Sequence, residues 1–104
     1  MGELAKRLRK SDQQIEALSL SDAEHRIGVS ILNLAEDMGI IRQGQVTIEK
    51  LPFQQDIANM AGTSRETVSR VLTMFEEKNM ITKIGHTLVI PDYLFFKRLF
   101  GKNL

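Results

Sequence analysis

The sequence predicts a mainly α-helical domain with a small β component, arranged as a winged helix-turn-helix. Two short amphipathic segments meet at Gly62, between residues 54 and 72, as the two helices of a helix-turn-helix do. A β-prone hairpin with Gly85 and His86 at its turn follows the second segment, in the position of a wing. The 104 residues suffice for one domain with an extension but not for two.

The composition is that of a soluble globular protein, with 42% hydrophobic and 26% charged residues. No apolar run reaches the length of a membrane span and no signal peptide is recognisable, so we expect no membrane partner and a cytoplasmic location. The lack of cysteine excludes disulfides, thiol catalysis and Cys-based metal sites. Because the net charge is only +1, binding to nucleic acid requires clustered cations. Two clusters exist, which also fit solvated helix faces: Lys6, Arg7, Arg9 and Lys10, and Lys97, Arg98 and Lys102.

The first twenty residues carry an apolar repeat of the coiled-coil type. Its members follow one another at alternating steps of four and three residues, with one polar position: Leu4, Leu8, Ser11, Ile15 and Leu18. A lone helix of this length is marginal in water, so it would gain stability by pairing with another copy. We therefore expect residues 1–20 to be the C-terminal part of a coiled-coil dimerisation helix; the alternative is a frayed helical tail.

Residues 21–104 carry the signals of a winged helix-turn-helix domain in order. Ser21-Asp22-Ala23-Glu24 has the form of a capping box, and the apolar stripe after it predicts a helix that closes at Gly39. The remaining elements expected are a β-prone pair around a glycine turn (40–48), the helix-turn-helix after Pro52, the two wing strands (80–84 and 87–90) and an apolar helix opened by Pro91-Asp92.

The segment from Gln54 to Leu72 carries the strongest signal. Ala58 is small enough for two helices to cross closely, and Gly62 supplies a turn that needs a positive φ. Thr63 or Ser64 can cap the second helix. The outer face of that helix carries four polar side chains: Arg65, Glu66, Ser69 and Arg70. An amphipathic helix pair with solvated charges is the alternative, but the spacing of small residue, glycine and cap before an Arg-Glu pair favours DNA binding.

The run from Gln54 to Leu72, followed by the hairpin, resembles the DNA-binding domain of the cyclic AMP receptor protein/FNR family of bacterial regulators. Gly62–Arg70 is close to that family's signature, and the match around Ile15–Leu18, Asp22 and Arg26 is looser. Family members normally carry an N-terminal sensor domain for a cyclic nucleotide, haem, an iron–sulfur cluster or another effector. Nothing here could build that domain, so we expect no cofactor and a truncated form that starts part-way along the dimerisation helix.

The resemblance implies that the second helix reads bases in double-stranded DNA. Arg65 and Arg70 can each donate two hydrogen bonds to guanine O6 and N7, and Glu66 can accept one from cytosine N4. The family assigns these residues such roles, which implies a palindromic operator with half-sites related to TGTGA. The alternative is that Glu66 and Arg70, four residues apart, pair mainly with each other on the surface.

Contacts to the DNA backbone are also expected, at both ends of the motif and at the wing. The candidates are Gln54, Gln55, Thr63, Ser64, Ser69, Gly85 and His86. Phe53 departs from the family, because it stands where a capping Thr or Ser is usual and its ring cannot accept an N–H bond. His86 also fits an ordinary exposed turn residue. Arg42-Gln43-Gly44 lies in the region that some family members use to touch RNA polymerase, although no motif supports that contact here.

Two other classes of function compete with DNA reading. A winged helix can serve only as a protein-interaction or dimerisation module, but such a surface would carry aromatic anchors in place of Arg65, Glu66 and Arg70. An enzyme is not expected, because His25 and His86 are accompanied by no nucleophile, metal cluster or phosphate-binding glycine loop. Without a sensor domain we expect this chain to be monomeric or a weak homodimer.

Overall fold

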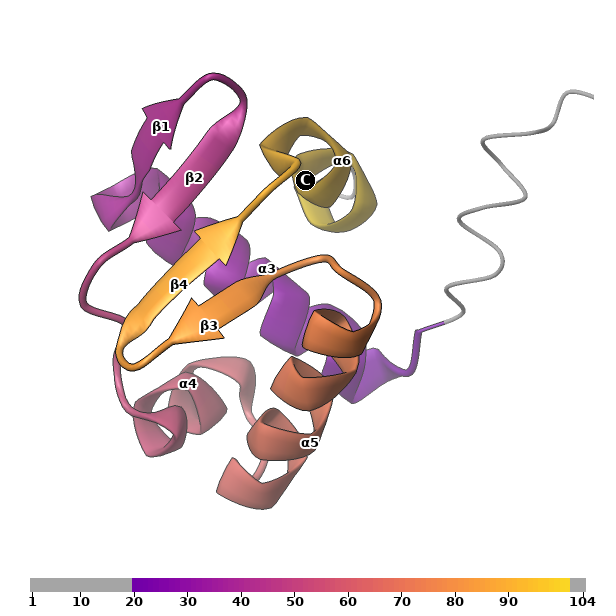
Figure 1. The fold of residues 1–104 in the computed structure, drawn as a ribbon. Coiled ribbons are helices and arrows are strands. Elements are labelled where there is room, and N and C mark those ends of the chain that lie inside the picture. Colours follow the sequence, from indigo (N-terminus) through magenta and orange to yellow (C-terminus); the bar gives the residue numbers. More distant parts are fainter. Residues whose placement is uncertain (1–19, 102–104) are drawn as a thin grey trace, which may run out of the picture.

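The computed structural model describes residues 20–101 and shows a bundle of helices beside a small sheet (Figure 1). The elements, in chain order, are α3 (Asp22–Met38), β1 (Ile40–Arg42), β2 (Gln45–Ile48), α4 (Gln54–Ala61), α5 (Arg65–Glu77), β3 (Thr82–Ile84), β4 (Thr87–Ile90) and α6 (Tyr93–Gly101). This confirms the predicted fold class, a mainly α-helical winged helix-turn-helix with a small β component. None of these helices is both long and apolar enough to cross a membrane.

The predicted dimer seam is not part of the described residues. Leu4, Leu8, Ser11, Ile15 and Leu18 all precede residue 20, as do Lys6, Arg7, Arg9 and Lys10. Lys102 follows residue 101. The coiled coil and the basic cluster of the first twenty residues therefore stay predictions.

Helix α3 begins at the predicted capping box. The Ser21 hydroxyl accepts a bond from the Glu24 amide at 3.2 Å, and the Ser21 amide donates to Glu24 Oε1 at 2.8 Å. Each bond satisfies an amide that the first turn of a helix leaves without an intrahelical partner. The helix ends as predicted at Gly39, whose amide donates to the Ala35 carbonyl at 2.9 Å.

The sheet has four antiparallel strands in the order β1-β2-β4-β3. The wing, β3 and β4, turns at Gly85 with a φ of 61°, and Lys83 stands opposite Leu88. β4 also pairs with β2, where Val46 stands opposite Ile90. The predicted wing is thus confirmed, although its first strand begins at Thr82. Met80 and Ile81, predicted as part of that strand, instead precede it and are buried in the core.

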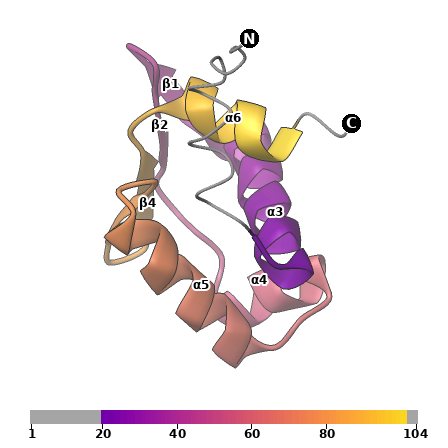
Figure 2. The ribbon, with the colours of Figure 1, turned by 90° about the vertical axis from the view of Figure 1, so that its right-hand side faces the viewer.

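Three phenylalanine rings pack against one another on one side of the core. Phe96 and Phe100 on α6 have ring centroids 4.7 Å apart, and both rings contact Phe75 of α5. Figure 2 shows α6 lying beside α3. The two helices approach closely because Gly28 faces the ring of Phe100, where a Cβ atom would clash.

Helix α6 is also tied to the first hairpin. The Asp92 carboxylate caps the helix by accepting a bond from the Phe95 amide at 3.1 Å, as Pro91-Asp92 predicted. The Tyr93 amide donates to the Gly44 carbonyl at 3.0 Å. Gly44 lies in the β1–β2 turn with a φ of 80°. α6 therefore fastens this turn to the rest of the domain.

Candidate nucleic-acid interface

The helix-turn-helix consists of α4, a short turn at Gly62, and α5. Gly62 has φ 70° and ψ 41°, the left-handed conformation predicted for it. Its amide and that of Thr63 both donate to the Ala58 carbonyl, which closes the end of α4. Ala58 and Ala61 are buried, so the small side chains let α4 pack closely on its neighbours.

Ser64 caps helix α5. Its hydroxyl accepts a bond from the Thr67 amide at 3.1 Å and lies 2.8 Å from the Thr67 hydroxyl. The sequence allowed either Thr63 or Ser64 in this role, and the structure selects Ser64. Thr63 is half-buried in the turn.

Arg26 on α3 holds the turn from outside the motif. Its Nε donates to the Ala61 carbonyl at 2.8 Å, and its Nη2 donates to the Gly62 carbonyl at 3.3 Å. Its Nη1 pairs with the Asp22 carboxylate one helical turn away. The sequence pointed to Arg26 only through the family resemblance. A second signal is the Asp22-x3-Arg26 spacing, which is that of a helical ion pair.

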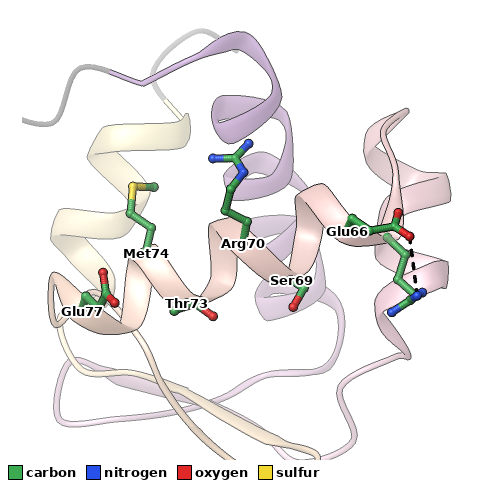
Figure 3. A pocket seen from close by; sticks show the side chains of 7 residues that line it. Glu66, Ser69, Arg70, Thr73, Met74 and Glu77 are labelled. Atoms are coloured by element: carbon green, nitrogen blue, oxygen red, sulfur yellow. Dashed lines mark ion pairs between the residues drawn. The ribbon is translucent and has the colours of Figure 1, made fainter.

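The outer face of α5 borders an open hollow of about 520 Å³. The predicted base-reading residues Arg65, Glu66 and Arg70 line it together with Ser69. Figure 3 shows the side chains of Glu66, Ser69 and Arg70 projecting from α5. Three further residues that sequence reasoning did not assign to this face complete the lining: Thr73, Met74 and Glu77. Their positions follow the same helical face toward its C-terminal end, so the period of the helix could have identified them.

The ion pairs on this face differ from the one considered as an alternative to base reading. Glu66 Oε2 lies 3.6 Å from Arg65 Nη2, and Arg70 Nη1 lies 3.6 Å from Glu24 Oε2 on α3. The alternative in which Glu66 and Arg70 pair with each other is therefore wrong for this structure. The reason is tertiary, because the start of α3 brings Glu24 within reach of Arg70 and Figure 3 shows Arg70 pointing toward α3.

Four of the residues expected at the DNA backbone fall at two places beside α5, whereas Thr63, Ser64 and Ser69 belong to the turn and to α5 itself. Gln54 and Gln55 form the first turn of α4, after Phe53, which makes no side-chain capping bond. Gly85 and His86 form the tip of the wing. The rings of Phe53 and His86 meet edge to face with centroids 5.9 Å apart, so the wing tip and the start of α4 are adjacent.

A helix-turn-helix with an exposed, cation-bearing second helix and a β-hairpin wing defines a DNA-binding class of domain. Residues 25–98 match the model of the Crp-like helix-turn-helix domain. The chain therefore belongs to the family of Crp-like helix-turn-helix domains.

Two relatives of known name carry the same kind of domain. The chain is 37% identical over 91 residues to the cAMP-activated global transcriptional regulator CRP of Pasteurella multocida, covering 85% of this chain and 42% of the relative. It is 32% identical over 89 residues to a CRP-like cAMP-activated regulator of Mycobacterium tuberculosis, covering 86% and 40%. The chain thus spans about two fifths of the length of these relatives. Both relatives are named as transcriptional regulators.

Solved structures show the same fold. The CO-dependent transcription factor CooA from Carboxydothermus hydrogenoformans, in its imidazole-bound form, superposes with a TM-score of 0.67 and 28% identity. That match covers 88% of this chain and 43% of CooA. A CRP/FNR family regulator from Thermus thermophilus superposes with a TM-score of 0.64 at 21% identity, over 93% of this chain and 50% of the other.

Proposed function

We propose that this chain is the DNA-reading part of a bacterial transcription regulator that recognises a palindromic duplex through α5. The observation that carries the proposal is the arrangement of Arg65, Glu66 and Arg70 on one exposed face, in the first half of a helix capped by Ser64. The N-terminal half of a recognition helix is the part that meets base edges in the major groove.

Each of the three residues has a base that suits its chemistry. The guanidinium groups of Arg65 and Arg70 match the two acceptors of guanine, and the carboxylate of Glu66 matches the amino group of cytosine. Half-sites related to TGTGA offer guanine and, on the complementary strand, cytosine. Arg65 pairs with Glu66 in this structure at 3.6 Å, so binding converts a surface ion pair into two base contacts.

Contacts to phosphate position α5 in the groove. The carbonyl of Phe53 accepts bonds from the amides of Asp56 and Ile57. The preceding amides of Gln54 and Gln55 belong to the first helical turn and can donate to a phosphate. On the α5 side the candidates are Thr63, Ser64 and Ser69, and on the wing Gly85 and His86.

Two protein partners complete the proposal. A palindromic operator calls for two copies, and the seam of residues 1–20 would join them weakly in this chain. Sedimentation equilibrium tests this, since a tight dimer at micromolar concentration would contradict a weak seam. RNA polymerase is the second partner, for which the exposed β1–β2 turn around Gln43 offers a surface. Ile41 beside it is 57% exposed.

The decisive experiment is a fluorescence anisotropy titration with two duplexes, one carrying a palindromic TGTGA-type site and one with the same bases scrambled. Arg65→Ala and Arg70→Ala should each weaken binding to the site by about 10- to 100-fold, because a bidentate arginine–guanine pair is worth roughly 1–3 kcal/mol. The scrambled duplex should be affected much less.

Arg98→Ala is the matched control, because it removes one positive charge from α6 and leaves α5 intact. If both α5 variants bind the site as well as the wild-type protein does, direct readout fails. A wild-type chain that shows no preference for the site would favour the alternative, a winged-helix interaction or dimerisation module.

A further inference from the structure

One residue outside the helix-turn-helix, Glu24, lies next to the face of α5 that is proposed to read bases. Glu24, in the first turn of α3, places Oε2 3.6 Å from Nη1 of Arg70. These two residues lie on different helices, and Figure 3 shows the Arg70 side chain leaving the face of α5 in the direction of α3. In this structure, therefore, a proposed base reader is turned toward a carboxylate of the protein itself.

The two partners differ in their exposure and in the other bonds that hold them. The other oxygen of Glu24, Oε1, accepts the Ser21 amide at 2.8 Å, and the Glu24 side chain is only 14% exposed. The Arg70 side chain is 64% exposed and has further N–H groups to offer. The carboxylate is thus held in place by the capping box, and Arg70 is the partner that can leave.

We propose that Glu24 sets the DNA affinity of this domain by competing with DNA for Arg70; this rests on the proposed function. In the free protein the pair neutralises Arg70 and directs it away from the groove. In the complex the Arg70 side chain contacts a guanine, and Glu24 is left unpaired near the negatively charged DNA. DNA binding therefore has to overcome both the ion pair and the repulsion between Glu24 and the nearby phosphates.

The substitution Glu24→Gln isolates this effect. Glutamine can also close a capping box, so α3 should keep its first turn while the charge is lost. We expect the full chain carrying Glu24→Gln to bind the TGTGA-type duplex more tightly. The pair itself should account for about two- to five-fold of the gain, the range of an exposed ion pair.

A double-mutant cycle separates competition from simple charge removal. In an Arg70→Ala background there is no pair to break, so Glu24→Gln should gain only the lost repulsion, about two- to five-fold less than in the wild-type background. Equal gains in both backgrounds would overturn the proposal. So would weaker binding of the single Glu24→Gln variant, because that result means Glu24 orients Arg70 in the complex.

Asp37→Asn is the matched control, because it removes one acidic charge from the other end of α3, about 20 Å away at 1.5 Å per residue. It should leave affinity within the error of wild type. The contact can also be checked without DNA, since the Nε resonance of Arg70 should shift in Glu24→Gln and not in Asp37→Asn. If the wild-type chain shows no preference for the TGTGA-type duplex, both the proposed function and this proposal are wrong. If the chain does prefer that duplex but Glu24→Gln raises the affinity equally in both backgrounds, only this proposal is wrong.

Discussion

The Nε of Arg26 donates a hydrogen bond to the main-chain carbonyl of Ala61 at 2.8 Å, across 35 positions of sequence. The same guanidinium reaches the Gly62 carbonyl at 3.3 Å. These carbonyls belong to the end of α4 and its turn, where a helix leaves acceptors without intrahelical partners. Arg26 thus joins α3 to the turn between α4 and α5.

Arg26→Ala should destabilise the domain by about 1–2 kcal/mol, because two carbonyls lose a charged donor and the site is partly exposed to water. Urea unfolding measures this. Asp22→Asn removes only the exposed partner of Arg26 and should cost less than about 0.5 kcal/mol. Similar unfolding midpoints for wild type and Arg26→Ala would show that the bonds from Arg26 to the two carbonyls contribute nothing to stability.

Ser64→Ala should destabilise α5 by about 1 kcal/mol, the usual cost of losing a capping hydroxyl. The Thr67 amide would lose its partner at 3.1 Å, which loosens the turn that carries Arg65 and Glu66. Unfolding and DNA titration should therefore both report the change. Thr63→Ala, one residue earlier, serves as the control for unfolding alone, since Thr63 is itself a candidate DNA contact, and an equal loss of stability there would argue against a specific cap.

Gly28→Ala should destabilise the domain even though alanine favours helix. The gain in helix propensity is roughly 1 kcal/mol, whereas overpacking a core costs typically about 1–3 kcal/mol. The clash should win because the Phe100 ring is enclosed by Phe75 and Phe96 and has little room to move.

Thermal unfolding measures that loss, and Asn33→Ala on the exposed face of α3 is the control. Combining Gly28→Ala with Phe100→Leu tests the cause, since the two changes should cost less together than the sum of their separate effects. Strict additivity would show that the ring is not what Gly28 makes room for.

The titration of Tyr93 should make the free energy of unfolding depend on pH in the alkaline range. Burial of the ring, and secondly the charge of Glu36, raise the pKa of Tyr93 above its usual 10.0. Since the folded pKa lies above the unfolded one, the contribution is complete below the unfolded pKa and is lost as pH rises through the folded pKa. Between these two pKa values we expect the free energy of unfolding to fall with rising pH in the wild type, and to fall less in Tyr93→Phe.

The titration itself is simple to follow, because the chain has one tyrosine and no tryptophan. Phenolate absorbance therefore reports Tyr93 alone. Glu36→Gln should lower the pKa only partly, as burial is the larger cause. A titration at the ordinary tyrosine pKa would contradict the raised pKa of Tyr93.

The features that the sequence determined by itself are those whose physics is local. The capping box of Ser21 and Glu24, the left-handed turn at Gly62 and the hairpin turn at Gly85 each depend on residues within a few positions of one another. The face shared by Arg65, Glu66 and Arg70 follows from the helical period alone. For that reason local patterns in the chain were enough to predict the winged helix-turn-helix and its candidate reading face.

Only the tertiary structure decided which partners those residues meet. The sequence left a pair between Arg70 and Glu66 open as the alternative to base reading, but the packing of α3 places Glu24 beside Arg70 instead. The clamp from Arg26 to Ala61 likewise joins segments far apart in the chain. Periodicity fixes which face of a helix a side chain occupies but says nothing of what another helix brings opposite it, because that depends on how the whole core packs.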